Sequence, residues 1–190
     1  MARPRSEDKR NAILSAATKA VATLGVEATT AKIAKGAGVA EGTLFTYFDS
    51  KDVLFNELYL DLKHDLRGEM TRGYPVAGSV VERGRHVWDR YIDWGVAYPF
   101  KRKAMSQLSI SERITEHSRD AGMAAFGEIN AMVHQISSNG PLKDQSPLFV
   151  AAMMNAIAEA TMEFIEREPK QAKRYKAAGF QAFWSAVAGV

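Results

Sequence analysis

The sequence predicts an all-α protein of about nine helices. Apolar residues recur with the 3.6-residue period of a helix in almost every segment, and no segment alternates β-branched and polar residues as a half-buried strand would. Glycine and proline residues stand between these periodic segments, where helices end and begin. The chain of 190 residues is long enough for a small helical module of about 50 residues fused to a larger helical body.

The first helix is expected over residues 6–25. Ser6 has the oxygen of an N-cap residue, and Glu7 and Asp8 place acidic groups in the first turn, where the helix dipole favours them. Gly25 is a natural C-terminal stop. The residues expected on the buried face are Ile13, Ala17, Ala20, Val21 and Leu24.

Two very short helices are expected next, over residues 30–36 and 41–48. Thr29 can cap the first of them, and the glycine-containing segment 36–39 separates the two. Asp49 or Ser50 then caps a long helix over residues 51–72. Two short helices joined by a tight turn and braced by longer ones are the layout of a helix-turn-helix.

Five further helices are expected in the rest of the chain. Pro99, the turn at 139–141 and Pro169 mark boundaries between some of them. We therefore expect two domains: a helix-turn-helix domain over 1–50 and a larger helical domain over 51–190, linked by helix 51–72. The five helices are expected at 79–98, 101–113, 118–137, 147–167 and 170–188.

The stretch from Gly25 to Leu54 resembles the DNA-binding signature of the TetR (tetracycline-repressor) family. The resemblance is strong over the first 55 or so residues, and beyond them it extends only to length and helical character. It implies a regulator of transcription, most commonly a repressor, that binds a palindromic operator as a homodimer and is released by a small molecule. It also implies that residues 1–50 are the DNA-binding domain and residues 51–190 the effector-binding and dimerisation domain. The matching residues are Thr29-Thr30, Ile33-Ala34, Ala37-Gly38-Val39, Gly42-Thr43-Leu44, Tyr47-Phe48 and Ser50-Lys51.

The same residues also make physical sense as a DNA-binding surface. Helix 41–48 has Leu44 and Phe48 to bury, which leaves its other face free to enter the major groove. Lys51 and the N–H groups at the start of the next helix can hold a phosphate. The DNA-binding residues expected are Thr29, Thr30, Lys32, Ala40, Glu41, Gly42, Thr43, Thr46, Tyr47 and Lys51.

Three positions depart from the family's pattern. Ala40 stands where a hydroxyl residue is usual, so the helix loses a side-chain cap worth roughly 0.5–2 kcal/mol. Glu41 repels phosphate unless it accepts a hydrogen bond from a cytosine amino group. Phe45 replaces a frequent tyrosine and is expected to pack rather than to contact DNA.

Some of these residues have a purely structural alternative. Thr29 is either a DNA contact or only an N-cap, and Tyr47 is either a phosphate contact or a half-buried aromatic. Arg3 and Arg5 belong either to an arm that touches the DNA minor groove or backbone or to a solubilising tail.

Helix 79–98 carries an aromatic stripe that is expected to face inward. Apolar walls with tyrosine and tryptophan polar tips suit a pocket for a hydrophobic or aromatic molecule, and the resemblance implies a sensor cavity in this part of the chain. Plain core packing is the alternative. The candidate ligand-binding residues are Val87, Trp88, Tyr91, Trp94, Tyr98, Met105, Leu108, Met123, Phe126, Phe149, Met153 and Phe164.

The last two helices are expected to form the dimer interface. Helix 147–167 has two apolar sides, one with Phe149, Met153, Ala160 and Phe164 and the other with Val150, Met154, Ile157 and Ile165. One neighbouring surface cannot cover both. The small-residue stripe of helix 170–188 permits close approach, so the two helices suit a four-helix interface between two copies, as the resemblance also implies. That stripe consists of Ala178, Gly179, Ala182 and Ala186.

Composition argues against catalysis. The chain has no cysteine and four scattered histidines, no HExxH motif occurs, and no cofactor or metal is expected. Glu82 and His86 are spaced to share a metal, although an exposed ion-pair-like contact is the commoner outcome. No secretory signal and no apolar run near the ~18 residues of a membrane span is expected, so the cytoplasm is the expected compartment. A DNA-binding protein without an effector and an all-helical enzyme are the alternative functions.

Overall fold

The computed structural model describes residues 6–138 and 140–189. Within these ranges the chain forms ten α-helices and two 3-10 turns and has no strand, which confirms the all-α prediction. Contacts divide it into two compact units, which we call unit 1 and unit 2. Unit 1 comprises the described residues up to Asp65 and Tyr98–Ala125, and unit 2 comprises Leu66–Ala97 and the described residues from Phe126 onward.

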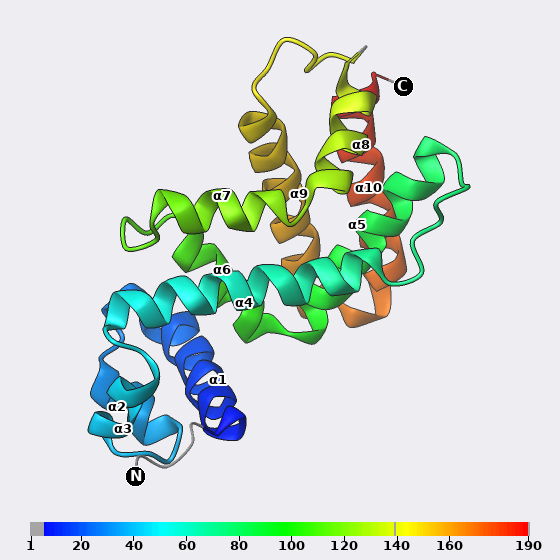
Figure 1. Cartoon of the computed structure of the whole chain (residues 1–190). Helices are drawn as coiled ribbons and strands as arrows, with labels where there is room; N and C mark the ends of the chain where they lie inside the picture. Colours follow the sequence, from blue (N-terminus) through cyan, green and yellow to red (C-terminus); the bar gives the residue numbers. More distant parts are fainter. Residues whose placement is uncertain (1–5, 139, 190) are drawn as a thin grey trace. The chain divides into compact units, whose positions relative to one another are not determined.

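Unit 1 contains the helix-turn-helix together with two later helices. The short helices α2 and α3 lie beside α1 (Figure 1), and α6 also packs against α1. This grouping by contacts differs from the expected domain boundary at residue 50. The expected boundary separates functions and stays a prediction. The elements of unit 1 are α1 (Glu7–Leu24), η1 (Gly25–Glu27), α2 (Thr30–Gly36), α3 (Glu41–Tyr47), the greater part of α4 (Lys51–Thr71), α6 (Pro99–Ser109) and α7 (Glu116–Ala124).

The ends of α1 follow the expected signals only in part. Gly25 ends the helix at a φ of 67°, a conformation that glycine adopts without steric cost. Ser6 occupies the N-cap position, but its hydroxyl makes no capping bond within the described part of the chain, so that expectation is wrong in detail. Leu24 was expected on the buried face and is exposed instead, because it is the last helical residue before the chain turns at Gly25.

The turn of the helix-turn-helix depends on Gly38. Its φ is 68°, and a Cβ built there would meet no atom within 4 Å, so the left-handed backbone rather than crowding calls for glycine. Behind the turn, the apolar residues of the first four helices form a closed core. Its fully buried members are Ile13, Ala17, Val21, Ile33, Leu44, Phe48, Leu54, Phe55 and Leu58.

Two helix boundaries differ from the predicted ones. Helix 101–113 is α6 and begins at Pro99, which takes the first-turn position that proline tolerates. The single helix expected over 118–137 is in fact α7 and α8, separated at Ala125 and Phe126. Thr115 starts α7 early by accepting a hydrogen bond from the Ser118 N–H at 3.2 Å, and Gly127, a weak helix former, begins the next helix.

Unit 2 is a group of packed helices around aromatic residues. α9 packs against both α5 and α10, and α8 packs against α5 and α10 (Figure 1). Trp88 of α5 stacks on Phe183 of α10, with 6.1 Å between ring centroids, and its Nε1 donates to the Lys176 carbonyl at 2.9 Å. The elements, besides the end of α4, are α5 (Val80–Ala97), α8 (Gly127–Ser137), α9 (Pro147–Arg167), η2 (Pro169–Gln171) and α10 (Ala172–Ala188).

The helix α9 contradicts the expectation that no apolar run is long enough to span a membrane. By length and composition alone, its 21 residues are long and apolar enough to cross a membrane. Much of the helix consists of alanine, methionine and other apolar residues. One such helix is weak evidence for a membrane span. Only 28% of its apolar window is buried, so α9 exposes an apolar surface that this chain alone does not cover.

Candidate nucleic-acid interface

The helix α3 turns one face inward and one outward. Leu44 and Phe48 are fully buried, as predicted. The outward face carries Glu41, Gly42 and Thr46 of the expected set, and Ala40 before the helix is also exposed. Thr43 is half-buried. A helix presented in this way, with small and polar side chains outward, fits the major groove of B-DNA.

Phe45 is on the outward face and not in the core. Its side chain is 43% exposed, against the expectation that it packs. The reason is helical geometry, because Phe45 follows the exposed Glu41 by four residues and so lies one turn further along the same face. That spacing was available in the sequence and would have identified Phe45 as a contact candidate, since an aromatic ring can meet a thymine methyl group.

The helix α2 presents hydroxyl and basic groups next to this face. The Thr29 hydroxyl accepts a hydrogen bond from the Lys32 N–H at 3.3 Å, so Thr29 is an N-cap as one of its two interpretations predicted. Thr29 and Lys32 are both exposed, and so is Lys35 one turn beyond.

A hydrogen bond joins the starts of α2 and α3. The Thr30 hydroxyl donates to the Glu41 carboxylate, with 2.5 Å between Oγ1 and Oε1. Thr30 and Glu41, both expected to contact DNA, are therefore hydrogen-bonded to each other. A hydroxyl has a single proton, so Thr30 cannot donate to a phosphate while it makes this bond.

Tyr47 is half-buried and anchors the start of α1. Its hydroxyl oxygen accepts the Ser6 N–H at 2.9 Å, which leaves the phenol proton for another acceptor. The two interpretations of Tyr47, packing and phosphate contact, are thus compatible. Arg3 and Arg5, the residues of the expected arm, lie outside the described residues.

The start of α4 keeps the features of a phosphate site. Ser50 caps the helix by accepting the Val53 N–H at 3.1 Å, and the N–H groups of the two residues between them belong to the unpaired first turn. The Lys51 ammonium lies 5.3 Å from the centre of the Phe55 ring, which holds its stem at this helix end.

Arg10 has a structural role within the same module. Its guanidinium pairs with Glu57 at 2.6 Å and lies 5.7 Å from the centre of the Phe48 ring. These contacts tie α1 to α3 and α4. The basic residues near the chain start therefore do not all face DNA.

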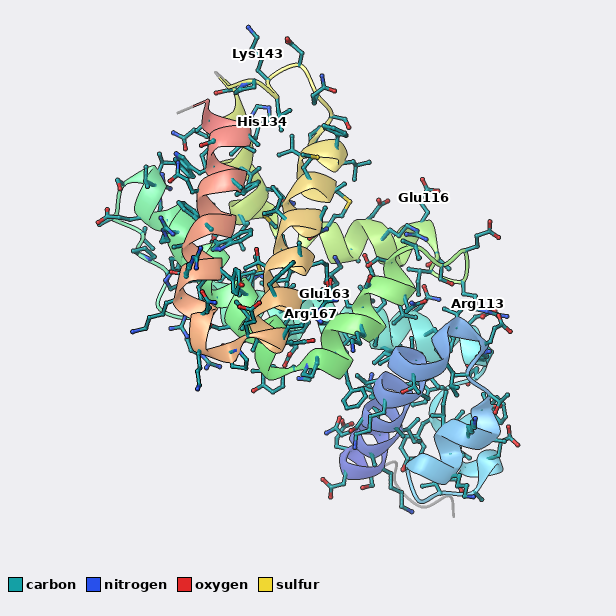
Figure 2. All side chains as sticks on the ribbon, turned by 180° about the vertical axis from the view of Figure 1, so that it is seen from behind. Arg113, Glu116, His134, Lys143, Glu163 and Arg167 are labelled. Atoms are coloured by element: carbon teal, nitrogen blue, oxygen red, sulfur yellow. The ribbon has the colours of Figure 1, made fainter. Side chains whose placement is uncertain are left out.

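The segment between α6 and α7 is tied to α4 by polar contacts. The Asn56 amide donates to the Arg113 carbonyl at 2.9 Å and accepts the Thr115 N–H at the same distance. Arg113, which is labelled in Figure 2, forms an ion pair with Asp52 at 2.8 Å. This carboxylate partner raises the pKa of the Arg113 guanidinium. A further ion pair joins Lys101 of α6 to Asp65 of α4 at 2.9 Å.

The expected ligand-binding residues divide between the two units. Val87, Trp88, Tyr91 and Trp94 are buried in unit 2, while Met105 and Leu108 are buried in unit 1. Phe126 and Met153 are half-buried in unit 2. The remaining members are exposed, namely Tyr98, Met123, Phe149 and Phe164.

Trp88 is tightly packed in unit 2. A Cβ on Gly179 would lie 2.7 Å from Trp88 Cζ2 and would also collide with Thr161 Oγ1. The Tyr91 hydroxyl donates to the side-chain oxygen of Asn155 at 3.2 Å, and Asn155 is exposed. Plain core packing therefore describes Trp88 better than ligand contact.

An apolar stripe runs along the exposed side of α9. Phe149 and Phe164, two of the expected ligand contacts, stand at its ends. Glu163 and Arg167 form an ion pair on the last turns of the helix (Figure 2). The stripe consists of Phe149, Ala152, Ala156, Ala160 and Phe164.

The described residues contain no group of three or more histidine, aspartate or glutamate side chains that could hold a metal. Glu82 makes neither the metal site nor the ion pair considered for it. Its carboxylate accepts the N–H and the hydroxyl of Ser79, both at 2.8 Å, and these bonds lower its pKa. Glu82 and Ser79 thus form a capping box at the start of α5.

Comparison with known proteins agrees with this geometry. Residues 13–58 match the family described as bacterial regulatory proteins, tetR family. The chain is 40% identical over 63 residues to the uncharacterised HTH-type transcriptional regulator YhgD of Bacillus subtilis, and the match spans a third of each protein.

Solved structures extend the similarity to almost the whole chain. A protein from Shewanella sp. PV-4, assigned to the tetR family of transcription regulators, has a TM-score of 0.82 and 27% identity, with 96% of this chain and 98% of that chain covered. LfrR, the TetR-like regulator of Mycobacterium smegmatis in complex with proflavine, shares the fold with a TM-score of 0.68 and 21% identity, over 95% and 98% of the two chains. Residues 13–58 are therefore similar to the tetR family of bacterial regulatory proteins, and the fold of the chain is similar to that of a protein assigned to the same family of transcription regulators.

Proposed function

We propose that the chain is a sequence-specific, ligand-responsive regulator of transcription. It is proposed to act in the cytoplasm as a repressor on a palindromic operator. The observation that carries the proposal is the outward face of α3, which presents Glu41, Gly42, Phe45 and Thr46 on a helix fixed by buried Leu44 and Phe48. The match of residues 13–58 to a family of regulatory proteins supports the expectation that the chain is not an enzyme.

The test is a fluorescence-anisotropy titration against palindromic DNA taken from beside the protein's own gene. Random DNA of the same length is the control, and both are titrated at two salt concentrations. Tighter, salt-sensitive binding at two subunits per site supports the proposal. Equal binding to both DNAs, together with failure to select any sequence from genomic fragments, contradicts it.

The partner subunit in this proposal is a second copy of the chain. The apolar stripe of α9 lies on the side away from its own buried residues, and the exposed Ala178 and Ala182 of neighbouring α10 offer small side chains for close approach. A dimer that binds two operator half-sites needs its two recognition helices about 34–36 Å apart, which is one DNA turn. Phe149 and Phe164 belong to this interface and not to a pocket.

The proposed effector is a small hydrophobic or aromatic molecule. Proteins of the same fold bind such compounds, namely proflavine in LfrR and stearoyl-CoA in FadR of Bacillus subtilis. Val87, Tyr91 and Trp94 are the candidates to meet it in unit 2. The tight packing of Trp88 favours the alternative, a regulator without an effector. Release of operator DNA by at least one compound of a planar and acyl library would decide for the effector.

Effector and operator would oppose each other through α4, which begins at the phosphate site. Within unit 1 the contacts of Asn56, Asp52 and Asp65 tie α4 to α6 and α7, so a shift of α6 is passed to the recognition module. Coupling of about 1–3 kcal/mol is typical of allosteric proteins. An Asn56→Ala variant that binds both partners but releases DNA poorly would support this route, whereas unchanged coupling would contradict it.

A further inference from the structure

We propose that Glu41 reads a cytosine in each operator half-site and that Thr30 holds the carboxylate in position for it. The inference rests on the proposed function, because it needs α3 in the major groove. Glu41 is the DNA-reading residue, and Thr30 acts through it as a positioning residue.

The position of Glu41 suits contact with a base edge. It is the first residue of α3, and the N-terminal residues of a recognition helix are those that approach the bases. Its side chain is exposed between Ala40 and Gly42, which are both small, and a Cβ built on Gly42 would meet nothing within 4 Å. Neither flanking residue is therefore bulky enough to stand between the carboxylate and the groove.

The chemistry of a carboxylate restricts what it can read. An ionised glutamate only accepts hydrogen bonds, so in the major groove it needs an amino group. Guanine and thymine present acceptors there, and adenine places the acceptor N7 next to its amino group. Cytosine presents N4 without an adjacent acceptor on the same base, which makes it the base that Glu41 favours.

Thr30 restrains one carboxylate oxygen and leaves the other free. Its hydroxyl donates to Oε1 at 2.5 Å, across the gap between α2 and α3. Oε2 keeps its lone pairs for a base. A glutamate with several rotatable bonds loses less conformational freedom on binding when a neighbour already holds it, so the bond favours recognition.

The acidic charge also penalises wrong sequences. A carboxylate near the phosphates repels DNA in general, and only a cytosine amino group at the right position offsets that repulsion. The exposed Lys32 on α2 supplies attraction that does not depend on sequence. Glu41 is therefore expected to lower non-specific affinity and to raise the ratio of specific to non-specific binding.

The experiment is selection of operator sequences from a randomised library with the full-length protein and its variants, followed by titration of single-base variants of the winning site. The wild type should select cytosine at one position in each half-site, and replacing that base should weaken binding roughly tenfold to a hundredfold. Glu41→Gln should change the preference toward adenine, since glutamine pairs with adenine N6 and N7. Glu41→Ala should bind all four bases at that position nearly equally.

Thr30 is tested by a matched pair. Thr30→Val removes the donor with little change of shape and should weaken the cytosine preference, while Thr30→Ser keeps the hydroxyl and should retain it. Glu7→Gln, which removes the same charge from the exposed first turn of α1, controls for charge and should leave the base preference unchanged. N4-methylcytosine in the operator should weaken the wild type but not Glu41→Ala.

The outcomes separate this inference from the proposed function. Sequence-selective binding by the wild type with the same base preference in Glu41→Gln and Glu41→Ala would overturn the role of Glu41. A Thr30→Val protein with wild-type preference would overturn the role of Thr30. A wild type without any sequence preference would instead overturn the proposed function.

Discussion

At the scale of single residues, Trp88 and Gly179 show how closely α5 and α10 pack. The indole lies against Phe183 and is fixed by its bond to the Lys176 carbonyl, and Gly179 leaves no room for a methyl group beside Trp88 and Thr161. The sequence assigned Gly179 to a small-residue stripe for a partner subunit. The structure places it in the chain's own core instead, since it is buried.

Gly179→Ala is expected to lower the free energy of unfolding by about 1–3 kcal/mol, because the added methyl group overpacks the core. Urea titration monitored by circular dichroism measures this free energy of unfolding. Gly68→Ala in α4 is the matched control, since a Cβ there meets nothing within 4 Å. It should stabilise by about 0.5–1 kcal/mol, as alanine does in a helix. Equal effects of the two changes would refute the packing argument.

Lys51→Ala is expected to weaken binding to operator and random DNA alike, because a phosphate contact carries no sequence information. The slope of log K against log salt should fall by about 0.9, the loss of one phosphate contact. Titrations at three or more salt concentrations measure it. Lys173→Ala, on the exposed surface of α10, should leave the slope unchanged. A selective loss of operator binding would show that Lys51 reads sequence.

At the scale of elements, the caps of α3 and α4 differ. Ser50 caps α4, whereas the N-cap position of α3 is Ala40, whose side chain has no acceptor. The sequence predicted the missing cap at Ala40 and offered Asp49 or Ser50 as the cap of α4, and the structure shows that Ser50 caps it. The split between α7 and α8 was missed because apolar periodicity continues through residues 118–137 and the break at Phe126 has no proline.

Ser50→Ala and Ala40→Ser are expected to act in opposite directions. The first should destabilise by about 0.5–2 kcal/mol through loss of the bond to the Val53 N–H, and the second should stabilise by supplying a missing cap. Thermal unfolding measures both, and the double variant should come close to the wild type. If Ala40→Ser left the midpoint unchanged, the N–H groups at the start of α3 would not need a side-chain acceptor.

At the scale of the whole molecule, we expect the apolar stripe of α9 to join the two copies of the proposed dimer. Ala156 lies at its centre, exposed in the single chain. A charge there would be buried without a partner if two copies meet along the stripe, which is costly. Ala156→Glu is therefore expected to give a folded monomer that binds a single half-site weakly.

Sedimentation velocity measures the change, and far-ultraviolet circular dichroism reports whether the helices persist. Ala77→Glu places the same charge on an exposed residue between α4 and α5 and should remain dimeric. If Ala156→Glu also remained a dimer, the subunits would associate through another surface.

The sequence alone determined the helical class, most helix bounds and the helix-turn-helix. These depend on local signals: apolar periodicity, caps such as Thr29, and the glycine at position 38 that permits a left-handed turn. Tertiary structure decided which apolar faces are covered by the chain itself. Phe149 and Phe164 proved to be exposed and Gly179 buried, and Thr30 was found bonded to Glu41. Periodicity says that a face is apolar, but only the packing of neighbouring helices decides what that face meets.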